Sequence, residues 1–95
     1  MMSALEELRQ EIDRLDAQLI EVVARRLQVC CQVAEYKRAH GLPVLQPERA
    51  AQVVERAIAQ GAAHGLDARF VRALYGLIMA EACRLEDEIV EDGRA

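Results

Sequence analysis

Apolar residues over the first forty positions recur at alternating intervals of three and four, which is the spacing of a heptad seam on an α-helix. The predicted helix begins at the capping-box sequence Ser3-Ala4-Leu5-Glu6 and ends where Gly41 and Pro43 follow His40. The seam consists of Leu5, Leu8, Ile12, Leu15, Leu19, Val22, Arg26, Val29, Val33 and Tyr36. One charged residue, Arg26, therefore interrupts an otherwise apolar stripe.

Two shorter amphipathic helices are predicted after a connector at residues 42–46. Pro47 suits the first position of a second helix, whose apolar stripe continues until the segment from Gly61 to Gly65. Asp67 is typical of a residue that caps a third helix, and that helix runs into an acidic tail. The pattern predicts an all-α fold of three helices in a single domain, residues 1–95.

The length of the first helix indicates that the chain does not act alone. About 37 residues at about 1.5 Å each give a rod of roughly 55 Å. A compact domain of this size has a diameter on the order of 30 Å and cannot enclose such a rod. We therefore expect part of the rod to pack against a second subunit.

Composition and charge narrow the function classes. Hydrophobic residues make up 53% of the chain, but only two Tyr and one Phe are aromatic, so the predicted core is aliphatic. The net charge of −4 argues against nucleic acid and anionic membrane surfaces as partners. We see no membrane span or signal core and expect a cytoplasmic protein with reduced thiols. The two His and three Cys lack metal-ligand spacing, so no metal site is predicted.

Three positively charged residues occupy positions that are unusual for charges on a solvent-exposed surface. Arg26 is in the apolar seam, and Lys37 returns to within about 20° of the same helix face, roughly 16 Å further on. Arg49 is in the first turn of the second helix, where the helix dipole favours an anion instead. Together they predict a pocket for an anionic ligand, although Arg26 could also reach solvent or pair with Glu81 as a structural ion pair.

Arg9 can join this pocket only from another subunit. It precedes Arg26 by about 25 Å and Lys37 by about 42 Å along one helix. In an antiparallel dimer, the start of the partner's first helix can lie beside the middle of this one, which gives two equivalent composite sites.

Several segments resemble the all-helical chorismate mutase family, in the family's order and spacing over nearly the whole chain. The most specific is the "LRxxIDxLD" pattern at residues 8–16; the others are Ala24-Arg25-Arg26, Tyr36-Lys37, Pro47-Glu48-Arg49 and Cys83-Arg84-Leu85-Glu86. The resemblance implies an intertwined homodimer of three-helix protomers. It also implies an isomerase of aromatic amino acid biosynthesis that converts chorismate to prephenate by a pericyclic Claisen rearrangement, without cofactor or metal.

The resemblance also assigns roles to individual positions. Arg26 and Arg49 would surround the carboxylates of a small dicarboxylate substrate, with Arg9 supplied in trans by the other subunit. Lys37 and Glu86 would lie at the ether oxygen whose bond breaks. Gln46 would lie near the ring and its C4 substituent, and Ala82 would line the pocket. Such a reaction needs only a fixed reactive conformation and stabilisation of the charge that grows on the ether oxygen.

Two positions depart from the typical bacterial pattern. Glu86 stands where many members have glutamine, and it can donate to the ether oxygen only when it is protonated, so we predict a pKa raised by burial. Ala50 stands where typical mutases carry an acid that meets the C4 hydroxyl.

Because this acid is missing, three substrates are possible. They are chorismate, 4-amino-4-deoxychorismate for a mutase, and isochorismate for an isochorismate-pyruvate lyase. Chorismate is favoured only because it is the commonest assignment for this scaffold. A non-catalytic helical dimerisation module, with Arg26 and Glu81 as a structural pair, is the alternative from another class.

Overall fold

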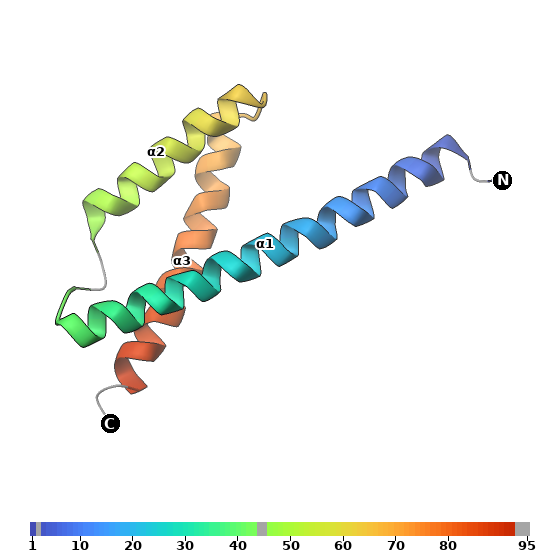
Figure 1. Cartoon of the computed structure of the whole chain (residues 1–95). Coiled ribbons are helices and arrows are strands. Elements are labelled where there is room, and N and C mark those ends of the chain that lie inside the picture. Colours follow the sequence, from blue (N-terminus) through green and yellow to red (C-terminus); the bar gives the residue numbers. More distant parts are fainter. Residues whose placement is uncertain (2, 44–45, 93–95) are drawn as a thin grey trace.

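The computed structural model describes residues 1, 3–43 and 46–92, and three helices make up its architecture (Figure 1). They are α1, Ala4–His40; α2, Pro47–Ala63; and α3, Ala68–Asp92. No strand occurs among these residues, so the predicted all-α fold with a very long first helix is confirmed. Parts of the predicted connector and of the acidic tail, residues 44–45 and 93–95, lie outside the described residues.

Local sequence signals set the helix bounds. The Ser3 hydroxyl accepts a hydrogen bond from the Glu6 backbone N–H at 3.1 Å, and Gly41 ends α1 in the left-handed conformation, with φ 67°. Pro47 occupies the first turn of α2. At the start of α3, an Asp67 carboxylate oxygen accepts from two backbone N–H groups at 2.8 and 3.3 Å. Each cap satisfies donors or acceptors that a helix end leaves unpaired.

The third helix holds the other two together. α3 packs against both α1 and α2, whereas α1 and α2 make no close backbone contact with each other in the described residues. Figure 1 shows α3 running from the end of α2 across the C-terminal half of α1, with the N-terminal half of α1 projecting away from both. Among the described residues, α3 is therefore the element that connects α1 and α2 by packing.

The closest approach of α2 and α3 depends on a small residue. Gly61 of α2 is buried, and a Cβ placed there would lie 2.8 Å from Cγ2 of Val71. Contacts this short are repulsive, so any larger side chain would push the two helices apart. Gly61 therefore sets the distance between α2 and α3.

The chain covers little apolar surface by itself. Among the described residues, the buried hydrophobic ones are Ala34, Ala57, Val71 and Ala82, and none of the larger side chains is fully buried. The apolar members of the α1 seam remain exposed, from 42% at Val33 to 65% at Val22. The described chain measures 59 × 28 × 15 Å, with a radius of gyration of 17.3 Å. This is the elongated shape that the predicted rod requires.

None of the described helices combines the length and apolarity that crossing a membrane requires.

Candidate active site

A pocket of about 720 Å³ lies between the three helices, a volume typical of small-molecule sites. It is lined mainly by aliphatic and small side chains, with a few polar groups placed among them. Six of the seven predicted site residues line it: Arg26, Lys37, Gln46, Arg49, Ala82 and Glu86. Arg26 and Lys37 come from α1, Arg49 from the first turn of α2, and Ala82 and Glu86 from α3.

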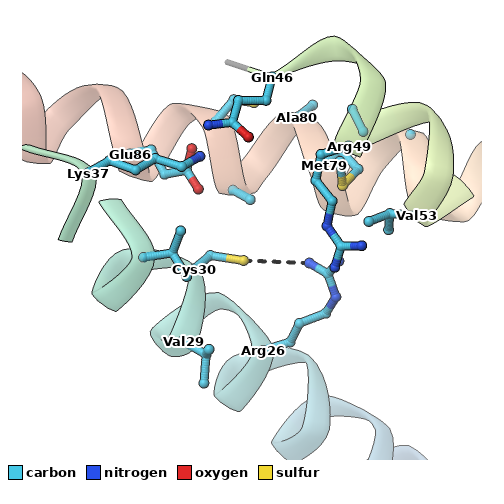
Figure 2. A pocket seen from close by; sticks show the side chains of 15 residues that line it. Arg26, Val29, Cys30, Lys37, Gln46, Arg49, Val53, Met79, Ala80 and Glu86 are labelled. Atoms are coloured by element: carbon cyan, nitrogen blue, oxygen red, sulfur yellow. Dashed lines mark hydrogen bonds between the residues drawn. The ribbon is translucent and has the colours of Figure 1, made fainter. Parts of the chain in front are cut away.

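Two guanidinium groups line one end of this pocket. Figure 2 shows the Arg26 side chain extending from α1 and the Arg49 side chain extending from α2 toward the same part of the pocket. In the described part of the chain, no carboxylate lies within ion-pair distance of either. Two like charges without an acid between them form an electrostatic site for an anion.

Arg26 is nevertheless held by two neutral groups. Its Nη1 donates a hydrogen bond to Sγ of Cys30, one turn further along α1, at 3.6 Å. Its Cζ lies 5.7 Å from the centroid of the Tyr75 ring on α3, within the range of a cation–π contact. The guanidinium of Arg26 is therefore positioned by α1 and α3 without being neutralised by an acid.

Glu86 and Lys37 occupy the other end of the pocket, where Figure 2 shows them next to each other. The Glu86 side chain is buried, with the residue 9% exposed. Burial raises the pKa of the Glu86 carboxyl, while the nearby Lys37 ammonium acts in the opposite direction, and burial is the larger effect. The predicted rise in the pKa of Glu86 is thus confirmed.

Gln46, Ala50 and Ala82 also line the pocket. Gln46 is the N-cap residue of α2, yet its side chain makes no capping hydrogen bond, so the amide is not committed to the helix end. Ala50 contributes only a methyl group to the pocket. Glu86 is the one acid that lines the pocket among the described residues.

Arg9 does not reach this pocket in the single chain. It lies on the exposed N-terminal half of α1. A role for Arg9 from a second subunit stays a prediction.

Sequence reasoning missed both groups that hold Arg26. Cys30 follows Arg26 by four residues and so lies on the same face of α1, a spacing that could have identified it. Tyr75 gave no such signal, because its contact with Arg26 depends on how α3 crosses α1. The structural pair between Arg26 and Glu81 does not form, because Glu81 binds Arg84 at 2.6 Å on its own helix. The non-catalytic alternative loses the ion pair on which it depended.

The cysteines are free. Cys30 and Cys83 both line the pocket, and burial, followed by the charge of Glu86, raises the pKa of the Cys83 thiol. Cys83 is therefore a neutral, weakly polar part of the wall.

Comparison with known proteins places these features in a family. Residues 8–87 match the family described as chorismate mutase type II. The 4-amino-4-deoxychorismate mutase of Streptomyces pristinaespiralis is 46% identical over 91 residues, which cover 96% of this chain and 70% of that protein. The enzyme of the same name from Streptomyces venezuelae is 43% identical over 86 residues, 90% of this chain and 84% of that protein.

A more distant relative carries a different name. The bifunctional chorismate mutase/prephenate dehydratase of Escherichia coli K12 is 30% identical over 84 residues, which cover 88% of this chain and 22% of that protein. The chain belongs to the chorismate mutase type II family. It is an isomerase of the chorismate mutase type, as its fold and its cationic pocket also suggest.

Proposed function

We propose that this pocket rearranges a chorismate-type enolpyruvyl ether to a prephenate-type product, and that 4-amino-4-deoxychorismate is its preferred substrate. The observation that carries the proposal is the arrangement of charge. Two guanidiniums without an acid partner face one end of the pocket, and a buried, protonatable carboxyl lies beside an ammonium at the other.

Each end matches one demand of the reaction. Arg26 and Arg49 bind the two substrate carboxylates, because a guanidinium fork donates two parallel hydrogen bonds to a carboxylate. This binding holds the flexible ether in the compact shape from which the new carbon–carbon bond forms. Lys37 and protonated Glu86 donate to the ether oxygen, which gains negative charge as its bond to the ring carbon breaks.

Position 50 differs from that of a typical chorismate mutase, in which an acid meets the C4 hydroxyl. Ala50 offers no carboxylate to accept a hydrogen bond from a C4 hydroxyl, so chorismate would lose a charge-assisted hydrogen bond there. The Gln46 amide oxygen can accept a hydrogen bond from a C4 amine or from a C4 hydroxyl. The choice of the amino compound rests on two relatives named 4-amino-4-deoxychorismate mutase, at 46% and 43% identity. Chorismate remains the second substrate, supported by the name of the Escherichia coli relative.

The active unit in this proposal is a homodimer. The exposed apolar seam of α1 provides the contact surface, because nine large side chains in one stripe are costly to leave in water. Antiparallel packing of two α1 helices brings Arg9 of one subunit to the pocket of the other. Arg9 then adds a third guanidinium to the carboxylate end.

The experiment that tests the substrate offers the purified protein 4-amino-4-deoxychorismate, chorismate and isochorismate separately. Substrate loss and product identity are followed by chromatography with mass detection. We expect the highest kcat/KM for the amino compound, with a prephenate-type product. A higher kcat/KM for chorismate would reassign the substrate, and no turnover of any of the three would contradict the proposed function.

An added acid tests whether position 50 controls the choice. Ala50→Glu places a carboxylate in the wall and is expected to change the ratio of kcat/KM for chorismate to that for the amino compound, because a carboxylate interacts with a C4 hydroxyl and with a C4 ammonium with different strength. Ala51→Glu adds the same charge one residue further along α2, at an exposed position outside the pocket lining. An equal effect of both variants would show that the ratio depends on net charge and not on the wall.

A further inference from the structure

The environment of Arg26 differs from that of the other arginines whose contacts are defined. Arg38, Arg69, Arg72 and Arg84 each pair with a carboxylate. Arg26, which is half-buried, instead contacts a thiol on α1 and an aromatic ring on α3. The Arg26 guanidinium is held by neutral groups and not by a carboxylate, so its positive charge remains available for a ligand.

The choice of neutral partners has a physical consequence for binding. A carboxylate beside Arg26 would occupy the same N–H donors that a substrate carboxylate needs, and the substrate would have to displace it. The face of an aromatic ring attracts a guanidinium through the ring quadrupole and leaves the N–H groups at the edge of the guanidinium plane unoccupied. The cation–π contact therefore restricts the position of the Arg26 guanidinium without occupying its N–H donors.

We infer that Tyr75 is a positioning residue for Arg26: its ring holds the guanidinium in place before the substrate binds, and the thiol of Cys30 assists by accepting from Nη1. This inference builds on the proposed role of Arg26 in binding a substrate carboxylate. A guanidinium that is already ordered loses less conformational freedom on binding, so the contact between substrate and Arg26 is stronger. Tyr75 itself is absent from the pocket lining and acts only through Arg26.

The test replaces the ring and asks whether its effect depends on Arg26. Tyr75→Leu keeps an apolar side chain but removes the π face. We expect kcat/KM for the preferred substrate to fall by about threefold to thirtyfold, the range that cation–π contacts support. Tyr75→Phe keeps the face, so it should retain kcat/KM within about twofold of the parent.

A double-mutant cycle separates positioning from a general structural effect. In an Arg26→Ala background, Tyr75→Leu should cause no further loss of kcat/KM, because the group that it positions is gone. An equal fold-loss in both backgrounds would overturn the inference. Parental activity of Arg26→Ala alone would contradict the proposed role of Arg26, and the inference with it.

A graded series keeps the inference testable if Tyr75→Leu does not fold. Phenylalanine and increasingly fluorinated phenylalanines at position 75 have nearly the same size, but fluorine withdraws electron density from the ring face. We expect kcat/KM to decrease stepwise with fluorination at an unchanged melting temperature. A constant kcat/KM across the series would show that the ring acts by packing alone.

The adjacent cysteines provide a matched pair for the second contact. Cys30→Ala removes the thiol that accepts from Arg26, and it should lower kcat/KM by about twofold to fivefold, as expected for a weak sulfur acceptor. Cys31→Ala removes the same thiol one position further along α1, outside the pocket lining, and should leave kcat/KM unchanged. Equal effects of the two substitutions would remove Cys30 from the positioning of Arg26.

Discussion

The carboxylate of Glu81 accepts two hydrogen bonds from Arg84, from Nε at 2.6 Å and from Nη2 at 2.9 Å, three residues further along α3. These hydrogen bonds hold the pKa of Glu81 below its ordinary value. The acid expected to compete for Arg26 is thus committed to another partner. The charge of Arg26 is left for the pocket.

The first prediction compares these two charged residues. Arg26→Ala should lower kcat/KM by about a hundredfold to a thousandfold, the usual loss when a charge-stabilising donor is removed. Glu81→Gln should leave kcat/KM within about twofold, because Glu81 pairs with Arg84 at a partly exposed position and is not among the residues that line the pocket. Steady-state kinetics of both variants check this, and a severe loss in Glu81→Gln would indicate that Arg84 or Glu81 contributes to the site.

The second prediction concerns pH. Glu86 donates to the ether oxygen only in its protonated form, so activity should fall as pH rises through its raised pKa. Glu86→Gln keeps a donor that does not titrate and should flatten this fall. Glu88→Gln, an exposed position on the same helix, should keep the parental profile. Profiles of kcat/KM against pH decide the matter, and identical profiles for Glu86→Gln and the parent would exclude Glu86 from proton donation.

The same group should affect stability with a defined sign. An unfolded glutamate titrates at about 4.3, and the folded protein holds the Glu86 proton more tightly. The contribution of this proton is fully present below the unfolded pKa and is lost as pH rises through the folded pKa. The free energy of unfolding should therefore decrease as pH rises from the unfolded pKa through the folded pKa of Glu86. This decrease, measured by chemical denaturation at several pH values, should be smaller in Glu86→Gln than in the parent, because glutamine does not titrate.

The third prediction tests the role of Arg9 in trans. Arg9→Ala and Arg26→Ala should each be nearly inactive alone. Coexpressed, they should form mixed dimers in which one of the two sites combines an intact Arg9 with an intact Arg26, so about a quarter of all sites are restored. Activity of the coexpressed mixture measures this directly. If Arg9 acted within its own chain, every site in the mixed dimer would lack one arginine and no activity would return.

The fourth prediction compares two helical glycines. Gly61→Ala should destabilise the fold by about 1–3 kcal/mol, because its Cβ would meet the buried Val71 side chain at 2.8 Å. Gly76→Ala has open space around its Cβ, and alanine favours the helix over glycine by about 0.8–1 kcal/mol. Chemical denaturation should thus show changes of opposite sign. Equal stabilisation by both substitutions would mean that α2 and α3 can separate without cost.

The helix bounds were predictable because local chemistry determines them. Ser3 and Asp67 accept from backbone N–H groups at helix starts, Gly41 ends α1, and Pro47 fits the first turn of α2, so no tertiary contact is needed to place these bounds. The size of the first helix also predicted the elongated shape. The residues of the pocket followed from spacing only in part, and the resemblance to a family supplied the assignments of Gln46 and Glu86.

What could not be predicted depends on how the helices cross. The contact of Tyr75 with Arg26 joins residues far apart in sequence, and no periodicity specifies which faces of α1 and α3 meet. The choice of Glu81 between Arg26 and Arg84 was open in the sequence. Arg84 lies three residues from Glu81 on the same helix and is therefore already beside it when the helix forms. This proximity favours the pair between Glu81 and Arg84.

The scarcity of buried side chains has a consequence for how the protein comes to be folded at all. In the described residues the buried hydrophobic core is limited to Ala34, Ala57, Val71 and Ala82, so the isolated chain gains little free energy from burying apolar surface. If the proposed homodimer forms, folding and association should then occur as a single bimolecular reaction. The melting temperature should rise with protein concentration, and dilution should remove structure and activity together.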